Sequence, residues 1–135
     1  MDKTESIINQ VLVAGSLAVS YFYGGWSSLL ALLLALVIID YLTGIAAAAK
    51  DGQLKSSIGF QGIARKVLIF TMVAIAHMVD VTLGNGNLFR DATIFFYLAN
   101  ELISIIENAG RLGLPVPDVM KKAVELFQAK DGVSK

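Results

Sequence analysis

A single carboxylate stands in the most apolar part of this chain. Between Ser6 and Ala49, Asp40 is the only charged residue. At helical spacing, Thr43 and Gly44 lie on the same face as Asp40. A carboxylate and a hydroxyl beside a small residue could handle a proton or an ion, pair with a cation, or receive a second helix at close range. We therefore treat Asp40, Thr43 and Gly44 as candidate functional residues.

Two later segments repeat this pattern of polar residues at helical spacing. In the first, His77 and Asp80 stand three positions apart. A histidine beside a carboxylate can relay protons, but we interpret these two as a local hydrogen-bonded pair. In the second segment, two places on the polar face can each be filled by either of two adjacent residues. Its candidate residues are Asn100 or Glu101, Ser104, and Glu107 or Asn108.

Enzymatic chemistry is not indicated by these groups. No segment offers the nucleophile, orienting partner and oxyanion donors that a hydrolytic site needs. The chain has no cysteine and one histidine, which excludes disulfides and argues against a metal site built on thiolates or imidazoles. No phosphate-binding loop, dinucleotide fingerprint or basic stripe for nucleic acid is present. We expect no catalytic activity, no cofactor, no metal and no nucleic-acid partner.

The elements that carry these residues have the composition of membrane helices. Hydrophobic residues make up 56% of the 135-residue chain and charged residues 16%, and the mean hydropathy is +0.67. These values lie outside the range of ordinary soluble domains. The apolar stretch around Asp40 would make a helix of roughly 66 Å, about twice the hydrocarbon thickness of a bilayer. It must cross twice, with the break at Gly24 and Gly25 beside interfacial aromatics.

The sequence predicts an all-α integral membrane protein with about four transmembrane helices. Three crossings are the alternative, because the fourth segment carries two glutamates. The domain limits are residues 1–112 for the transmembrane part and 113–135 for a cytoplasmic tail. Within the first part, the helices are expected near residues 7–23, 27–49, 63–83 and 92–109.

Basic residues indicate the orientation of these helices. With four crossings, ten of the eleven lysines and arginines lie on the side of the two termini, and only Arg90 lies opposite. The positive-inside rule then places both termini in the cytoplasm. A three-crossing scheme would leave the five basic residues of the tail outside, so it is the weaker alternative.

The tail is predicted to hold an amphipathic helix that is too polar to span the membrane. Asp118 can cap this helix, and lysines occupy one of its faces. We expect it to lie on the inner leaflet, to pack on the tails of partner copies, or to be solvated in the cytoplasm. The apolar face comprises Val119, Met120, Ala123, Leu126 and Phe127.

Ordinary structural explanations exist for the charged candidates. Asp40 can pair within its own subunit with Arg65 or Lys66, whose long side chains reach inward from the cytoplasmic interface. Glu107 and Arg111 stand four positions apart, as in a common ion pair on a helix surface. The alternative for Asp40 is contact with water or with a partner chain, because an ionised group facing lipid costs at least about 2.5 kcal/mol.

Three motifs occur in one order and spacing along the chain. The first is Asp40-Tyr41-Leu42-Thr43-Gly44. The second is Leu54-Lys55-Ser56-Ser57 with Gly62-Ile63-Ala64-Arg65-Lys66, and the third is the run Asn-Glu-Leu-Ile-Ser-Ile-Ile-Glu-Asn at 100–108, followed by Gly110, Gly113, Pro115 and Pro117. With these motifs in register over nearly its whole length, the chain resembles the toxin-secretion and phage-lysis holins, a family of short bacterial membrane proteins.

This resemblance implies a protein that accumulates in the cytoplasmic membrane of a host bacterium and forms homo-oligomers among the membrane lipids. Its lesions would let a cytoplasmic endolysin reach the cell wall, and in some relatives the cargo is a toxin. In the mechanism we expect, polar helix faces hide against one another at low density and line water at high density. The alternatives are a small ion channel or proton-coupled subunit, and a membrane anchor that recruits a soluble partner through the tail.

Overall fold

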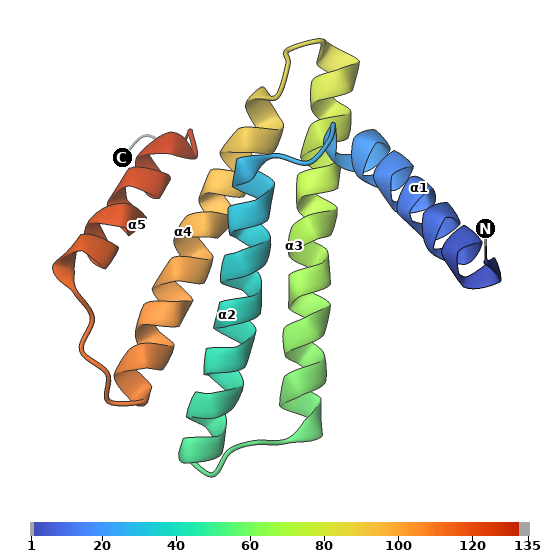
Figure 1. The fold of residues 1–135 in the computed structure, drawn as a ribbon. Coiled ribbons are helices and arrows are strands. Elements are labelled where there is room, and N and C mark those ends of the chain that lie inside the picture. The colour runs from blue at the N-terminus through green and yellow to red at the C-terminus, as the bar shows by residue number, and fades with distance from the viewer. Residues whose placement is uncertain (1, 133–135) are drawn as a thin grey trace.

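The computed structural model describes residues 2–132, which form five α-helices and no strand. The predicted all-α architecture, with apolar helices followed by a C-terminal helix, is confirmed (Figure 1). The helices are α1 (Lys3–Tyr23), α2 (Ser28–Lys50), α3 (Ser56–Leu83), α4 (Leu88–Arg111) and α5 (Asp118–Lys130).

Three of these helices make the central bundle. In Figure 1, α2, α3 and α4 run side by side along most of their length, while α5 lies against α4 and α1 projects away from the bundle. In the packed layer between α2, α3 and α4, the fully buried residues are all aliphatic, and partly buried aromatic side chains pack against them. This core consists of Leu30, Leu33, Val37, Ile69, Val73, Ile94 and Leu98.

The first helix is joined to the bundle only at its C-terminal end. None of the residues of α1 is buried. Its last residue, Tyr23, donates a hydrogen bond from its hydroxyl to the carbonyl of Phe70 in α3, at 3.1 Å. Gly24 then ends the helix with a left-handed φ of 73°, a conformation that favours glycine because it has no Cβ. The predicted break therefore falls at this residue.

The third helix begins earlier than the sequence indicated. It starts at Ser56 rather than near residue 63, so the small and polar residues 56–62 are helical. Gly59 and Gly62 have a packing reason for lacking side chains, because the ring of Tyr41 lies against both. A Cβ at Gly62 would stand 3.2 Å from a ring carbon of Tyr41, and the Tyr41 hydroxyl lies 3.4 Å from the Gly59 carbonyl.

The C-terminal helix folds back along α4 of its own chain, a placement that the sequence did not indicate. Val124 is buried there, and the ring of Phe127 lies 6.2 Å from that of Phe95. Val119 and Leu126, assigned to the apolar face, are instead 66% and 63% exposed. The prediction that Asp118 caps the helix is wrong, since Asp118 is the first helical residue and the cap position belongs to Pro117, which makes no side-chain cap bond.

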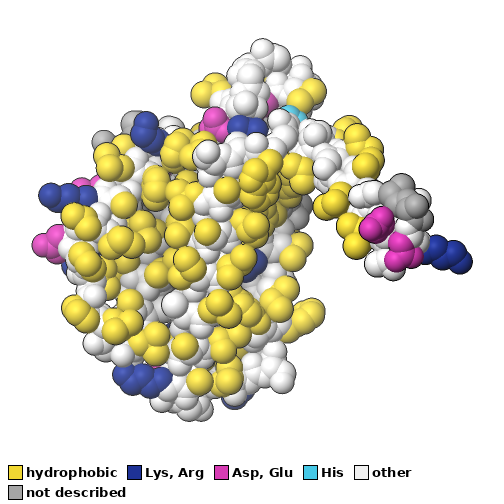
Figure 2. Space-filling model, viewed as in Figure 1, with side chains coloured by type: hydrophobic (Ala, Val, Ile, Leu, Met, Phe, Trp, Pro, Cys, Tyr) yellow, Lys and Arg dark blue, Asp and Glu magenta, His cyan; other side chains and the backbone are white. Residues whose placement is uncertain are grey.

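Three helices are long and apolar enough to cross a membrane by themselves, namely α1, α2 and α3. Hydrophobic side chains cover most of the bundle face in Figure 2, and most Lys and Arg side chains in that view lie near its edges. The fourth helix does not meet the same criterion. Two of its charged residues, Arg90 and Glu101, are nevertheless buried. The surface of α4 therefore carries fewer charges than its composition suggests.

Candidate functional site

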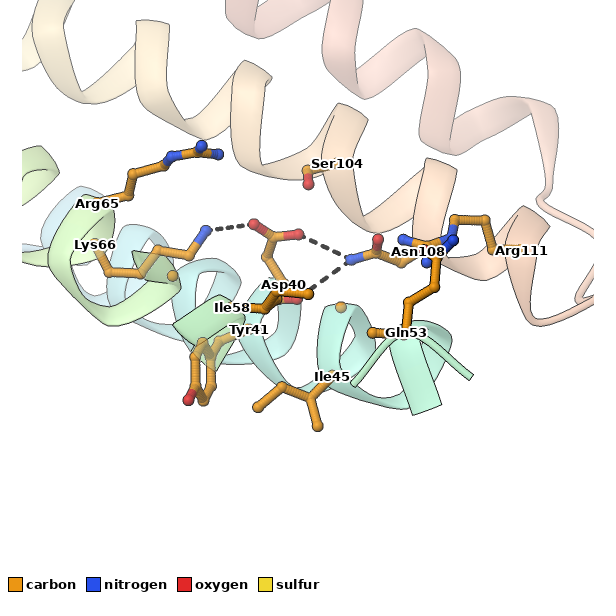
Figure 3. A pocket seen from close by; sticks show the side chains of 13 residues that line it. Asp40, Tyr41, Ile45, Gln53, Ile58, Arg65, Lys66, Ser104, Asn108 and Arg111 are labelled. Atoms are coloured by element: carbon orange, nitrogen blue, oxygen red, sulfur yellow. Dashed lines mark hydrogen bonds and ion pairs between the residues drawn. The ribbon is translucent and has the colours of Figure 1, made fainter. Parts of the chain in front are cut away.

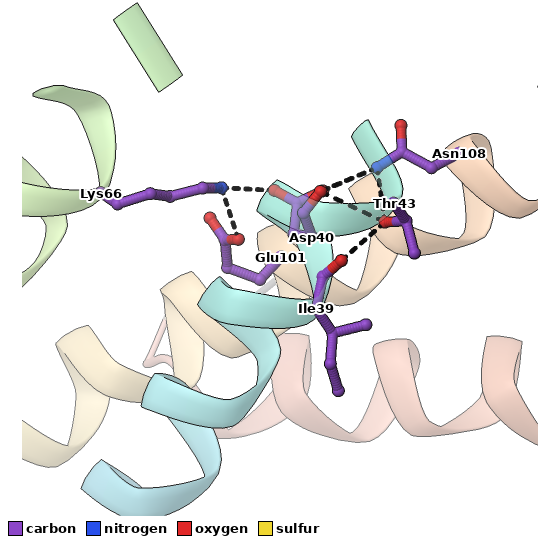
Figure 4. A network of polar contacts seen from close by, with 6 residues as sticks. All are labelled: Ile39, Asp40, Thr43, Lys66, Glu101 and Asn108. Carbon is purple, nitrogen blue, oxygen red and sulfur yellow. Dashed lines mark hydrogen bonds and ion pairs between the residues drawn. The ribbon is translucent and has the colours of Figure 1, made fainter. Parts of the chain in front are cut away.

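A buried charged network, which we call the lysine cluster, joins the three bundle helices. It consists of Asp40 and Thr43 from α2, Lys66 from α3, and Glu101 and Asn108 from α4 (Figure 4). The Lys66 ammonium contacts a carboxylate oxygen of Asp40 and donates to Glu101 Oε2 at 2.7 Å. One cation thus holds two carboxylates from different helices. Of the two partners proposed for Asp40 within its own subunit, the structure has Lys66.

The amide of Asn108 completes the cluster from α4. Its Nδ2 lies 3.0 Å from Asp40 Oδ1 and 3.0 Å from Thr43 Oγ1. The Thr43 hydroxyl in turn donates to the carbonyl of Ile39 at 2.8 Å. Both carboxylate oxygens of Asp40 therefore have partners, which is the condition under which a buried charge is tolerated.

Close helix approach makes this contact possible. A Cβ placed on Gly44 would lie 3.5 Å from Asn108 Nδ2, so the short amide reaches α2 at a position that carries no side chain. The predicted small-residue face of α2 is thus in contact with α4 of the same subunit. Ser104, one turn before Asn108, lines a cavity beside Asp40 together with Arg65 (Figure 3).

A second buried polar group, the turn cluster, lies where α3 turns into α4. Asp80 accepts hydrogen bonds from the backbone N–H groups of Phe89 and Arg90, both at 2.8 Å. These are donors of the first turn of α4, which have no partner within their own helix. Arg90 also donates from Nη1 to the carbonyl of Tyr23 at 2.8 Å. The turn cluster thus joins the ends of α1, α3 and α4.

The predicted hydrogen bond between His77 and Asp80 is not what the structure has. The carboxylate oxygens of Asp80 accept from the backbone of α4, and His77 Nδ1 is buried without a hydrogen-bond partner among residues 2–132. The imidazole packs against Gly24, where a Cβ would come within 2.7 Å of His77 Cε1. His77 therefore shapes the junction between α1 and α3.

The two ambiguous positions in α4 are resolved by burial. Glu101 and Asn108 face the bundle, whereas Asn100 and Glu107 are exposed. Arg111, suggested as a partner of Glu107, instead pairs with Asp51 at the end of α2, with Arg111 Nη2 at 2.9 Å from Asp51 Oδ2.

Two residues of these clusters were not selected from the sequence. Lys66 was named as a residue of the second motif and as one of two possible partners for Asp40, and Arg90 only as the one basic residue on its side of the membrane. The isolation of Arg90 was a usable signal, because a lone cation far from the other basic residues calls for a local acceptor. Among the described residues, no group of three or more histidine, cysteine, aspartate or glutamate side chains is placed to hold a metal ion.

The fold and the site together define a helical membrane protein that keeps a charged network between its helices. A model of the bacteriophage holin family matches residues 17–129. The chain belongs to this family, as the three sequence motifs indicated. No solved structure matches the chain significantly.

The chain is also similar to individual bacterial and phage proteins. The chain is 51% identical to an uncharacterized protein of Halalkalibacterium halodurans, over 84% of this chain and 88% of the relative. It is 46% identical to an uncharacterized protein of Listeria innocua, over 93% and 91% of the two chains. A probable holin of Bacillus phage phi105 is 35% identical over 73% of each chain. Of these three relatives, the phage protein is the one named as a probable holin.

Proposed function

We propose that this protein acts as a holin: copies accumulate in the cytoplasmic membrane of a host bacterium, associate, and open lesions that release an endolysin or a toxin. The role is non-enzymatic, and the cargo does the chemistry. Four helices cross the membrane and both termini lie in the cytoplasm. The surfaces that exchange between subunits, and then face water, carry the lysine cluster together with Gly44, Asn100, Ser104 and Glu107. His77 and Asp80, the other two candidate residues, hold the helix ends together within each subunit.

The observation that carries this proposal is the lysine cluster itself. Asp40, Glu101 and Asn108 are each at most 7% exposed, inside helices whose outer surfaces are largely apolar. Such groups are costly at membrane depth and are usually found where ions, water or other helices need them. An apolar layer would hold the three helices together more simply, because well-packed hydrophobic residues often replace a buried ion network without loss of stability.

The mechanism depends on the ratio of charged groups in the lysine cluster, which is one lysine to two carboxylates. Lys66 bridges Asp40 of α2 and Glu101 of α4 within one subunit. When copies are crowded, the same three groups can form the same two contacts between neighbours, so the helices separate without leaving a charge unpaired. The polar faces that open in this exchange become hydrated, and they form the wall of the lesion.

The folded-back tail helix bears on the same transition. Lys130 lies 5.9 Å from the ring of Phe95, which is in the second turn of α4. If α4 crosses the bilayer, the charged face of α5 in this position would meet lipid, at a cost of about 2.5–3.5 kcal/mol per charge near the bilayer centre. In the proposed topology α5 therefore leaves α4 on insertion and moves to the cytoplasmic surface, which frees one face of α4 for a neighbouring subunit.

The test is to induce the protein alone in a bacterium and to measure which molecules cross the inner membrane. Appearance of a folded cytosolic enzyme outside the membrane is the expected result. Leakage of ions alone would refute the lesion and favour a channel. Deletion of residues 118–130 should leave killing intact, whereas complete loss of killing would point to an anchor for a soluble partner.

A substitution pair makes the test specific for the cluster. Asp40→Leu leaves Lys66 paired with Glu101, so the variant should reach normal levels in the membrane but release no enzyme. Glu5→Leu is the matched control, because it removes an exposed carboxylate in the first turn of α1. Full enzyme release by Asp40→Leu at wild-type membrane levels would contradict the mechanism.

A further inference from the structure

We propose that the end of the bundle formed by the α2–α3 connection binds an anionic phospholipid, with the phosphate at Arg65 and an acyl chain between α2 and α3. The inference rests on the membrane topology given above, in which this end faces the cytoplasm. It concerns a binding site on each subunit and does not require that a lesion forms.

The headgroup part of the site is a polar cavity of about 290 Å³ between α2, α3 and α4 (Figure 3). It extends from the α2–α3 connection to the lysine cluster. Three basic side chains and one acidic side chain line it, along with two amides, so its lining is positively charged on balance. These residues are Asp40, Gln53, Arg65, Lys66, Asn108 and Arg111.

Arg65 is the one of these three cations that is left without an acceptor. Lys66 is held by Asp40 and Glu101, and Arg111 by Asp51. Within residues 2–132, the Arg65 guanidinium makes no ion pair or hydrogen bond, and in Figure 3 it extends from α3 toward α4. A guanidinium presents its N–H donors in a fork that matches two phosphate oxygens. The cavity therefore offers a phosphate ligand that the protein itself does not satisfy.

An apolar groove adjoins this cavity along the bundle. Its volume is about 440 Å³, and it shares Tyr41 and Lys66 with the polar cavity as lining residues. From Tyr41 to Leu34 the groove follows α2 for about 10 Å, which is enough for several methylene groups of a lipid chain. Its apolar lining includes Leu34, Ile38, Leu42, Ile63, Val67 and Phe70.

The depth of the two hollows matches the order of groups in a lipid. The 28 residues of α3 make a helix of about 42 Å, longer than the hydrocarbon core of about 30 Å. The polar and small residues 56–62 lie at the α2–α3 end. Arg65 lies about 14 Å along α3 from Ser56, so its long side chain can extend the guanidinium toward the inner phosphates. The groove then runs toward the middle of the bilayer, where the chain of such a lipid would lie. Basic pockets between helices on the cytoplasmic side are common headgroup sites.

The binding test uses the purified full-length chain in detergent, titrated with dioleoyl phosphatidylglycerol or dioleoyl phosphatidylcholine and examined by native mass spectrometry. We expect the anionic lipid to be retained about tenfold more tightly than the neutral lipid, and Arg65→Gln to remove this preference. Lys55→Gln is the control, because it removes an exposed cation at the same end that lines neither hollow. Equal retention of the two lipids by the wild-type chain would overturn the proposal.

Two further measurements distinguish a bound lipid from a bound free anion. Ile38→Trp should fill the groove and weaken retention of both lipids severalfold, while Leu32→Trp, on α2 but outside the groove, should not. Inorganic phosphate or glycerol 3-phosphate should fail to displace the lipid at millimolar concentration. Displacement by either anion, together with normal binding to Ile38→Trp, would show a soluble phosphate site and would refute the lipid assignment.

These outcomes are independent of lesion formation. A chain that binds the anionic lipid through Arg65 but releases no enzyme from cells would refute the proposed function and leave the site standing. A chain that releases enzyme but does not distinguish the two lipids would refute the lipid site and leave the proposed function standing.

Discussion

The lysine cluster and the turn cluster occupy opposite parts of the same bundle, and they are built from different kinds of bond. In the lysine cluster, charged side chains from three helices hold one another. In the turn cluster, Asp80 accepts from backbone N–H groups at the start of α4, and Arg90 binds the Tyr23 carbonyl and the carboxylate of its neighbour Asp91. Between them lies the aliphatic layer that includes Leu33, Val73 and Leu98.

This difference separates what can be exchanged from what is fixed. The backbone N–H groups that Asp80 binds lie nine and ten residues further along the same chain, so the short α3–α4 connection favours this contact within one copy. Ion pairs between side chains can be remade with the same groups of a neighbour. The turn cluster therefore acts as a permanent fastening of α1, α3 and α4, whereas the lysine cluster is suited to rearrangement.

The strongest way to break this comparison is to remove the shared cation. Lys66→Met leaves the carboxylates of Asp40 and Glu101 close together and without a counter-charge. The free energy of unfolding should fall by about 3 kcal/mol or more, measured by thermal or denaturant unfolding in detergent. In cells, we expect lesions to open earlier than in the wild type, because the bundle separates more easily.

A charge-free variant shows whether the loss is electrostatic. The triple substitution Asp40→Asn, Lys66→Met and Glu101→Gln should regain most of the lost stability, because no unpaired charge remains buried. If this variant is as unstable as Lys66→Met, the packing of the lysine side chain matters more than its charge, and the contrast between the clusters loses its basis.

The turn cluster should respond differently to loss of its acid. Asp80→Ala leaves the N–H groups of Phe89 and Arg90 without their acceptor, which should reduce the free energy of unfolding by about 2–3 kcal/mol. Hydrogen exchange at these two amides should accelerate while exchange in the middle of α2 stays slow. The timing of lesions should change little at matched membrane levels, and a shift as large as that of Lys66→Met would contradict a purely fastening role.

A smaller effect is expected where α1 joins the turn cluster. Gly24→Ala places a Cβ in a left-handed conformation and within 2.7 Å of His77 Cε1, which should cost about 2 kcal/mol in unfolding measurements. Gly25→Ala is the control, since its φ is also positive, at 106°, but nothing lies within 4 Å of the new Cβ. Equal destabilisation by both variants would show that backbone strain, and not contact with His77, determines the effect.

The smallest effect should come from the exposed ion pair at the α2–α3 end. Arg111 and Asp51 are 41% and 39% exposed at their side chains, so water already screens the pair. Arg111→Gln should change the free energy of unfolding by less than about 1 kcal/mol. A loss comparable to that of Lys66→Met would show that exposure does not distinguish the ion pairs of this molecule.

The sequence allowed prediction of the helices and of all but one charged residue of each cluster, for reasons that differ from residue to residue. Asp40 was recognisable because it is alone among apolar neighbours, and its small-residue face correctly indicated a closely approaching helix. Which helix approaches was not predictable, since intrasubunit and intersubunit contacts place the same demand on the sequence. The choice between Asn100 and Glu101 likewise depends on the rotation of α4, which only its packing against α2 and α3 sets.

In each case where the sequence prediction failed, a contact between distant parts of the chain overrode the local pattern. His77 and Asp80 have the right spacing for a pair, but the free N–H groups of α4 provide better-placed donors for the carboxylate. The start of α3 was missed because glycines usually signal a turn, and here two of them make room for Tyr41. The folding of α5 onto α4 depends on a contact between Phe95 and Phe127 that no local pattern reveals.

The first helix is attached to the protein through a single turn, and none of its residues is buried. Apart from its last residue, Tyr23, which binds Arg90 and Phe70, α1 contributes nothing buried to the packing of the other helices. Its sequence is free to match a bilayer of another thickness or composition while the residues that follow Gly24 keep their packing unchanged. Variation in α1 would alter the position of the protein in a membrane and would leave the packing of α2, α3 and α4 unchanged.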